Sequence, residues 1–136
     1  MPVLDHTIVP VTDAAVSLRF YTEVLGLDAD GEDGPFLVVR VNADTLLLLA
    51  PFGTDGGHHL AFALTAREFD EVFDRIKAAG IPYGDSYHAV GNMAGPGNEF
   101  GARGMAPSLY LFDPDRHLIE IRHYGAAPGS PPSEPI

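Results

Sequence analysis

Cysteine, tryptophan and positive charge are the scarcest features of this sequence. Its 136 residues include no Cys and no Trp, and 8 Lys or Arg stand against 19 Asp or Glu, for a formal net charge of −11. Without cysteine there is no disulfide, no thiolate nucleophile and no cysteine-ligated zinc or iron–sulfur site. We also expect no nucleic-acid partner, because its binding requires a cationic surface that displaces counterions.

Long apolar segments are missing too. The longest apolar run, 45–52, already contains Pro51 and falls far short of the roughly 20 residues that a membrane-spanning helix needs. Residues 1–5 have neither the basic nor the apolar segment of a secretion signal. With 46% apolar residues, the chain can still bury the core of one domain. We therefore expect a cytoplasmic globular domain with no membrane partner.

The predicted elements occur in the same order twice. In the first half, the apolar pattern predicts a strand, a helix and two further strands, over 2–11, 14–25, 36–41 and 45–50. In the second half it predicts a strand, a helix and three strands, over 58–64, 65–79, 81–87, 107–112 and 117–122. His6 lies 53 residues before His59, as Thr12 does before Thr65. This fixed offset indicates an α+β fold of two βαβββ modules, about 1–53 and 57–125.

Two segments have no counterpart in this repeat. Residues 84–106 are rich in glycine and predict a long loop, which we expect to act as a lid that orders over a substrate. Residues 126–136 contain four prolines and predict a disordered tail.

Three ionisable side chains in predicted strands suggest a metal site. His6 and His59 hold matching positions in the two modules, and Glu120 lies in the last strand. If the modules pack about a pseudo-twofold axis, the histidines face one another and Glu120 approaches the same point. Two imidazoles and one carboxylate on one face of a metal leave positions open for substrate and oxygen, as in non-haem Fe(II) oxygenases. Taken singly, each histidine is better explained as a hydrogen-bonded core residue and Glu120 as a surface residue; the matched positions favour the metal site.

Four segments carry a resemblance to a known superfamily. They are His6–Val11, Phe20–Leu27, His59–Phe62 and Asp113–Ile121. Together they resemble the vicinal oxygen chelate superfamily, which includes glyoxalase I, extradiol dioxygenases and the bleomycin and fosfomycin resistance proteins. The resemblance covers residues 3–125. It implies paired βαβββ modules that form a cup-shaped mixed sheet, a metal at His6, His59 and Glu120, and a homodimer.

The sequence departs from glyoxalase I in one respect. Those enzymes usually carry a fourth ligand, a Glu in the fourth strand of the first module. Here that strand, 45–50, offers Leu47 and Leu48, which cannot coordinate a metal. Three ligands fit an oxygenase better than a glyoxalase.

A narrower resemblance involves His6–Pro10, Gly34–Phe36, Phe69–Ile76 and His117–Glu120. These segments are similar to the ChaP-like branch of aromatic polyketide oxidases. The branch implies an Fe(II) enzyme, with Ni, Mn or Zn as other candidate metals, that oxidises a polycyclic phenol or cleaves its C–C bonds in natural-product biosynthesis. Oxygen would be taken up directly or delivered by a reduced flavin. The alternatives are an antibiotic-sequestering resistance protein of the same fold and a glyoxalase-like isomerase.

Further candidates concern the small aromatic substrate. Tyr110 is a candidate catalytic residue that would donate a proton to a bound phenolate, although packing explains it equally well. Five other residues are candidates for substrate contact: Leu48, Asn92, Met93, Phe100 and Arg103.

Overall fold

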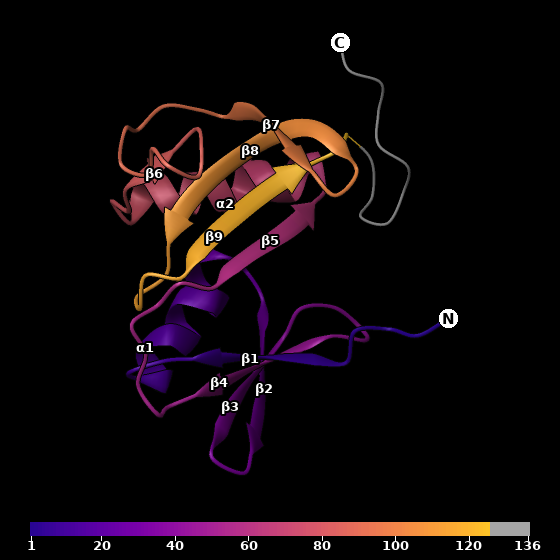
Figure 1. The fold of residues 1–136 in the computed structure, drawn as a ribbon, viewed down its shortest axis with the longest axis vertical. Helices are drawn as coiled ribbons and strands as arrows, with labels where there is room; N and C mark the ends of the chain where they lie inside the picture. The colour runs from indigo at the N-terminus through magenta and orange to yellow at the C-terminus, as the bar shows by residue number, and fades with distance from the viewer. Residues whose placement is uncertain (126–136) are drawn as a thin grey trace. The chain divides into compact units, whose positions relative to one another are not determined.

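The computed structural model describes residues 1–125, and the chain forms two compact units (Figure 1). Unit 1 consists of residues 1–58 and 113–116, and unit 2 of residues 59–112 together with those from 117 onward. Each unit combines a β-sheet with helical segments, so the predicted α+β class is confirmed. The predicted tail, 126–136, lies outside the described residues. No helix within residues 1–125 is long and apolar enough to cross a membrane.

Unit 1 is built on a four-stranded sheet, sheet A. Its elements are β1 (His6–Pro10), α1 (Ala14–Arg19), the π-helical turn η1 (Phe20–Val24), β2 (Asp28–Asp33), β3 (Phe36–Arg40) and β4 (Leu46–Ala50). The strand order is β1-β4-β3-β2, with β1 parallel to β4 and the other pairs antiparallel. The carboxylate of Asp13 accepts hydrogen bonds from the backbone N–H groups of Ala15 and Val16, which fixes the start of α1.

Unit 2 is built on sheet B. Its elements are β5 (His59–Leu64), α2 (Ala66–Ala78), β6 (Tyr83–Gly84), β7 (Gly97–Gly101), β8 (Gly104–Phe112) and β9 (Leu118–His123). The strand order is β5-β9-β8-β6, and β7 pairs with β8. Thr65 and Glu68 form a capping box at the start of α2. The apolar face of that helix buries Phe69, Val72 and Ile76.

The two sheets share one topology, which confirms the internal repeat. In each, an edge strand runs parallel to its neighbour, and antiparallel strands follow. His6 is paired with Leu46 on β4, and His59 is paired with Leu118 on β9. Two residues further along, Leu48 is paired with Ile8 on β1, and Glu120 is paired with Ala61 on β5. Leu48 therefore holds, in sheet A, the position that Glu120 holds in sheet B.

Sequence patterns missed two strands. β2 was not predicted, because all six of its residues are exposed and it is held by backbone pairing to β3 rather than by apolar burial. β7 and the start of β8 lie within 84–106, which was wrongly predicted to be a continuous loop. Glycine signalled a loop there, but a Cβ at Gly97 would overlap the carbonyl of Asp85. The absence of a side chain at Gly97 allows its backbone to lie close to that of Asp85. The lid role predicted for residues 84–106 stays a prediction.

The turn between β8 and β9 packs within unit 1. The Tyr21 hydroxyl donates to the Asp113 carboxylate at 2.7 Å, and both residues are buried. The carboxylate of Asp115 accepts the backbone N–H of Thr12 at 3.2 Å. Burial, together with the negative charge of Asp113, raises the pKa of Tyr21 far above its ordinary value. The turn thus anchors α1 and η1 to a segment about 90 residues away in sequence.

We expect Tyr21→Phe to lower the free energy of unfolding by about 1.5–3 kcal/mol, because it removes the buried donor to a carboxylate. The unfolded tyrosine ionises near pH ~10 whereas the folded one does not, so wild-type stability falls above that pH. The difference between the two proteins should therefore narrow in alkaline solution. Urea unfolding at pH 7 and at alkaline pH measures both effects. Tyr87→Phe, at an exposed tyrosine, is the control; an equal loss there would contradict the assignment.

Candidate metal-binding pocket in unit 2

The position of Glu120 follows from the packing of β9. Ile119 and Ile121 are fully buried, and His123 contacts the ring of Phe69 on α2 at 5.0 Å between centroids. Because side chains alternate along a strand, Glu120 must then point to the opposite face of sheet B, as must Arg122. The burial of two isoleucines against α2 thus places two charged side chains together on the other face, where both are more than nine-tenths buried.

His59 and Glu120 lie close enough to act together. Nε2 of His59 is 2.9 Å from Oε1 of Glu120. The imidazole is half exposed, with a side-chain exposure of 50%, while the carboxylate is 7% exposed. In the register of β5 and β9, Glu120 faces Ala61, whose methyl side chain lines the same pocket. The imidazole of His59 is thus open to ligands, whereas the carboxylate of Glu120 is enclosed by the protein.

The spacing of this pair fits a divalent metal. Imidazole nitrogen and carboxylate oxygen bind such metals at about 2.1 Å, and two ligands at right angles are then about 3.0 Å apart. The observed 2.9 Å is that of an ordinary hydrogen bond and is also compatible with that separation. No group of three His, Asp or Glu side chains within residues 1–125 is gathered closely enough to hold a metal by itself. The three-ligand set of His6, His59 and Glu120 stays a prediction.

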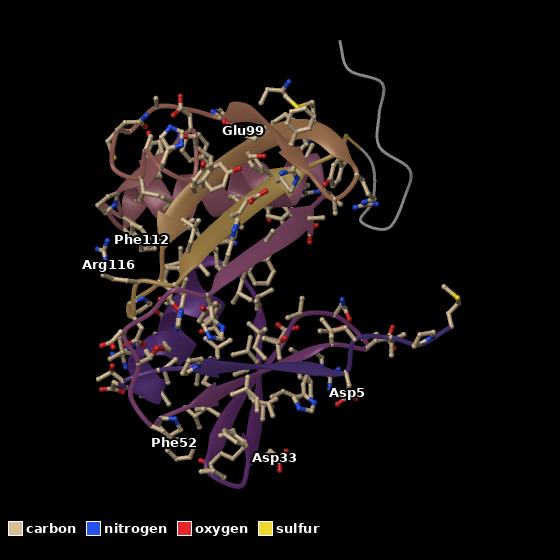
Figure 2. The ribbon with its side chains drawn as sticks, in the orientation of Figure 1. Asp5, Asp33, Phe52, Glu99, Phe112 and Arg116 are labelled. Atoms are coloured by element: carbon tan, nitrogen blue, oxygen red, sulfur yellow. The ribbon has the colours of Figure 1, made fainter. Side chains whose placement is uncertain are left out.

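His6, the third predicted ligand, belongs to unit 1. Its Nδ1 lies 2.7 Å from Oδ2 of Asp5, and the side chain is 44% exposed. That contact leaves Nε2 as the ring nitrogen directed away from Asp5. A carboxylate on one imidazole nitrogen is the usual partner of a histidine whose other nitrogen binds a metal. Asp5, labelled in Figure 2, therefore fits the role of an orienting residue for His6.

A pocket of about 430 Å³ adjoins the His59–Glu120 pair. Its walls come from β5, β9 and the turn between β7 and β8, and the lining residues are His59, Ala61, Ala63, Phe100, Gly101, Ala102, Arg103, Glu120, Arg122 and Tyr124. Two of the predicted substrate-contacting residues, Phe100 and Arg103, lie in this pocket beside two of the predicted metal ligands. The Arg103 guanidinium stacks on the ring of Tyr124 at 4.4 Å.

The other predicted substrate-contacting residues lie elsewhere. Asn92 donates to the carboxylate of Asp85 at 2.8 Å and accepts the backbone N–H of Ala94, so it holds the shape of its own loop. Met93 is half exposed, and its backbone N–H donates to the carbonyl of Tyr83. Leu48 is buried in sheet A of unit 1. None of the three is among the residues that line the pocket of unit 2.

Tyr110, the candidate catalytic residue, is paired with Glu120 across β8 and β9. It is buried and does not line the pocket itself. Burial, together with the negative charge of Glu120, raises the pKa of Tyr110 to about 12. Its phenol therefore keeps its proton at neutral pH.

Arg122 and Tyr124 were not among the predicted site residues. Arg122 donates to Oε2 of Glu120, and the guanidinium groups of Arg103 and Arg122 lie 4.4 Å and 5.2 Å from the centre of the Tyr124 ring. A signal for Arg122 was present, since it lies two positions after Glu120 on β9 and shares its face. Tyr124 follows the last residue of that strand. What the sequence could not show is that the turn between β7 and β8 covers this face.

Comparisons with known proteins agree with this architecture. The model of the Glyoxalase/Bleomycin resistance protein/Dioxygenase superfamily matches residues 3–121. Virulence protein STM3117 of Salmonella typhimurium is 31% identical over 130 residues, covering 89% of this chain and 83% of the relative. The solved structure of Oxidase ChaP-H1 is 34% identical, covers 93% of this chain and 100% of its own, and superimposes with a TM-score of 0.75. Oxidase ChaP-H2 is 31% identical, with coverages of 90% and 93% and a TM-score of 0.75. The chain therefore belongs to the Glyoxalase/Bleomycin resistance protein/Dioxygenase superfamily.

Proposed function

We propose that this protein is a metal-dependent oxidase that acts on a polycyclic aromatic phenol, with oxidation of a ring or cleavage of a C–C bond. The observation that carries the proposal is the His59–Glu120 pair, 2.9 Å apart at the edge of a pocket that also holds aromatic rings. The similarity to two ChaP oxidases, over nine-tenths or more of the chain, supports an oxidase. An isomerase and a sequestering protein are the rival functions.

His6, His59 and Glu120 are the proposed ligands of an Fe(II) ion. When bound, such a metal supplies a Lewis acid for the substrate's oxygens and one-electron exchange with oxygen. The three side chains hold it throughout the reaction. Glu120 contributes the only negative charge among them, so the metal keeps a net positive charge that favours a phenolate substrate.

Leu48 supports an oxidase over an isomerase. The strand registers give Leu48 the position in sheet A that Glu120 holds in sheet B, and leucine has no donor atom. A site with three protein ligands keeps coordination positions for both substrate and oxygen, whereas a fourth ligand would take one of them.

The pocket of unit 2 suits an aromatic ring. Phe100 offers an exposed ring, and the small side chains of Ala61 and Ala63 leave room beside the His59–Glu120 pair. Burial of apolar surface contributes roughly 25 cal/mol per Å² to binding. Arg103, held on the face of Tyr124, supplies positive charge for a substrate phenolate. Tyr110 keeps its proton and is paired with Glu120 across β8 and β9.

We expect the protein to bind about one Fe(II) or Mn(II) ion per chain, and His6→Ala, His59→Ala and Glu120→Ala each to lose it, because each removes one of three ligands. Elemental analysis after anaerobic loading and desalting measures the content. His58→Ala, which changes the neighbouring histidine, should retain the metal. Full metal content in all three ligand variants would refute the assignment.

A homodimer is also part of the proposal. We expect light scattering to give twice the 14.5 kDa mass of the chain. A monomer that binds metal and turns over substrate would remove the dimer from the proposal.

Oxygen consumption separates the oxidase from its rivals. We expect the Fe(II)-loaded protein to consume oxygen in the presence of a polycyclic phenol, directly or from a reduced flavin, and to release an oxidised product. The zinc-loaded protein should be inactive, because zinc has no accessible redox change. An oxygen electrode with product analysis by mass spectrometry provides the measurement. Equal turnover without oxygen or with zinc would favour an isomerase, and phenol binding without turnover would favour sequestration.

A further inference from the structure

Arg122 is the charged side chain most completely enclosed by its partners in this pocket. Its Nη1 donates to Oε2 of Glu120 and, at 3.0 Å, to the carbonyl of Phe100. Its Nη2 donates to the carbonyls of Glu99 at 2.9 Å and Gly104 at 3.0 Å. All four terminal N–H groups are thus used, and the side chain is 3% exposed. A planar guanidinium held at four points has one orientation available to it.

We propose that Arg122 is a positioning residue that fixes Glu120 as a metal ligand through one oxygen only. The inference rests on the proposed metal site. Arg122 occupies Oε2 of Glu120, while Oε1 lies beside Nε2 of His59. A carboxylate that binds a metal through both oxygens takes up two coordination positions. By holding Oε2, Arg122 keeps one of those positions available for substrate or oxygen.

The arginine also links this carboxylate to the wall of the pocket. The carbonyls that it binds belong to β7 and to the start of β8, and Glu99 is labelled on this hairpin in Figure 2. Residues of the hairpin turn line the pocket. A Cβ at Gly101 would overlap the guanidinium, so glycine is required for this close approach. The position of the substrate-facing turn and the orientation of Glu120 are therefore set by one side chain.

The repeat argues that this arginine is not needed to build the sheet. Arg122 faces Ala63 in the register of β5 and β9, and Ala50 faces Pro10 at the matching point of β1 and β4. Sheet A thus forms the same strand pairing with alanine at the position of Arg122. At these matched positions only unit 2 has an ion pair, formed by Glu120 and Arg122, whereas unit 1 has Leu48 and Ala50.

Arg122→Lys tests the proposal, because it keeps the charge and loses the four-point geometry. The probe is Mn(II): its affinity is measured by electron paramagnetic resonance of the free ion, and the number of metal-bound waters by water proton relaxation. We expect Mn(II) to bind about 10-fold more weakly or worse, the usual cost of losing an outer-shell partner. We also expect one bound water fewer, because the released carboxylate can bind through both oxygens.

Arg67→Lys is the matched control. Arg67 pairs with Glu71 on the exposed side of α2, and its replacement should change neither measurement. Wild-type affinity and water count in Arg122→Lys would overturn the inference while leaving the metal site intact. Weaker binding with an unchanged water count would also overturn it, since that result indicates a purely structural role. A wild-type protein that binds no Mn(II) would overturn both this inference and the proposed metal site.

A second variant covers the case in which Arg122→Lys does not fold. Gly101→Ala keeps Arg122 but places a methyl group where the guanidinium lies. We expect the displaced arginine to release Oε2 of Glu120 and to give the same loss of one bound water. An unchanged water count in a folded Gly101→Ala protein would contradict the proposal.

Discussion

The burial of Ile119 and Ile121 against α2 is the constraint on which the candidate site depends. Because β9 is paired on both sides, by β5 and by β8, each of its side chains lies on one of the two faces of sheet B. The isoleucines take the face covered by the helix, and Glu120 and Arg122 are left with the other. A one-residue slip of this strand would bury both charges under α2, so the hydrophobic effect fixes the register and with it the chemistry.

A buried ion pair is tolerated here because each charge is compensated. Glu120 has Arg122 and His59 as partners, and Arg122 has three backbone carbonyls in addition to the carboxylate. Removing one member of such a pair leaves an uncompensated buried charge, which typically costs ~3–5 kcal/mol. A pair of this kind contributes orientation more than stability. Orientation is what the proposed role of Glu120 as a metal ligand requires.

The two units show how a repeated fold can acquire a one-sided site. Sheets A and B have the same strand order and matching registers, and each begins with a histidine. The strands paired with these histidine-bearing strands are β4 in unit 1 and β9 in unit 2. At two matched positions, β4 has Leu48 and Ala50, whereas β9 has Glu120 and Arg122. The backbone pairing is satisfied equally by both sets, because ladder hydrogen bonds do not depend on side-chain identity. Unit 1 thus has buried apolar side chains at these positions beside its histidine, and unit 2 has the carboxylate with the arginine that holds it.

The sequence by itself determined the repeat, the helices, most strands and the candidate ligands His6, His59 and Glu120. These features rest on local periodicity, on capping residues and on a fixed offset, all of which can be seen along one dimension. β2 and β7 were missed because backbone pairing, which leaves no apolar pattern, holds them in place. Only the tertiary structure decided that Phe100 and Arg103 share a pocket with His59 and Glu120, and that Arg122 clamps the carboxylate. Those contacts join a hairpin turn to a strand about 20 residues later, and such pairings depend on how the sheet closes around its core rather than on any local pattern.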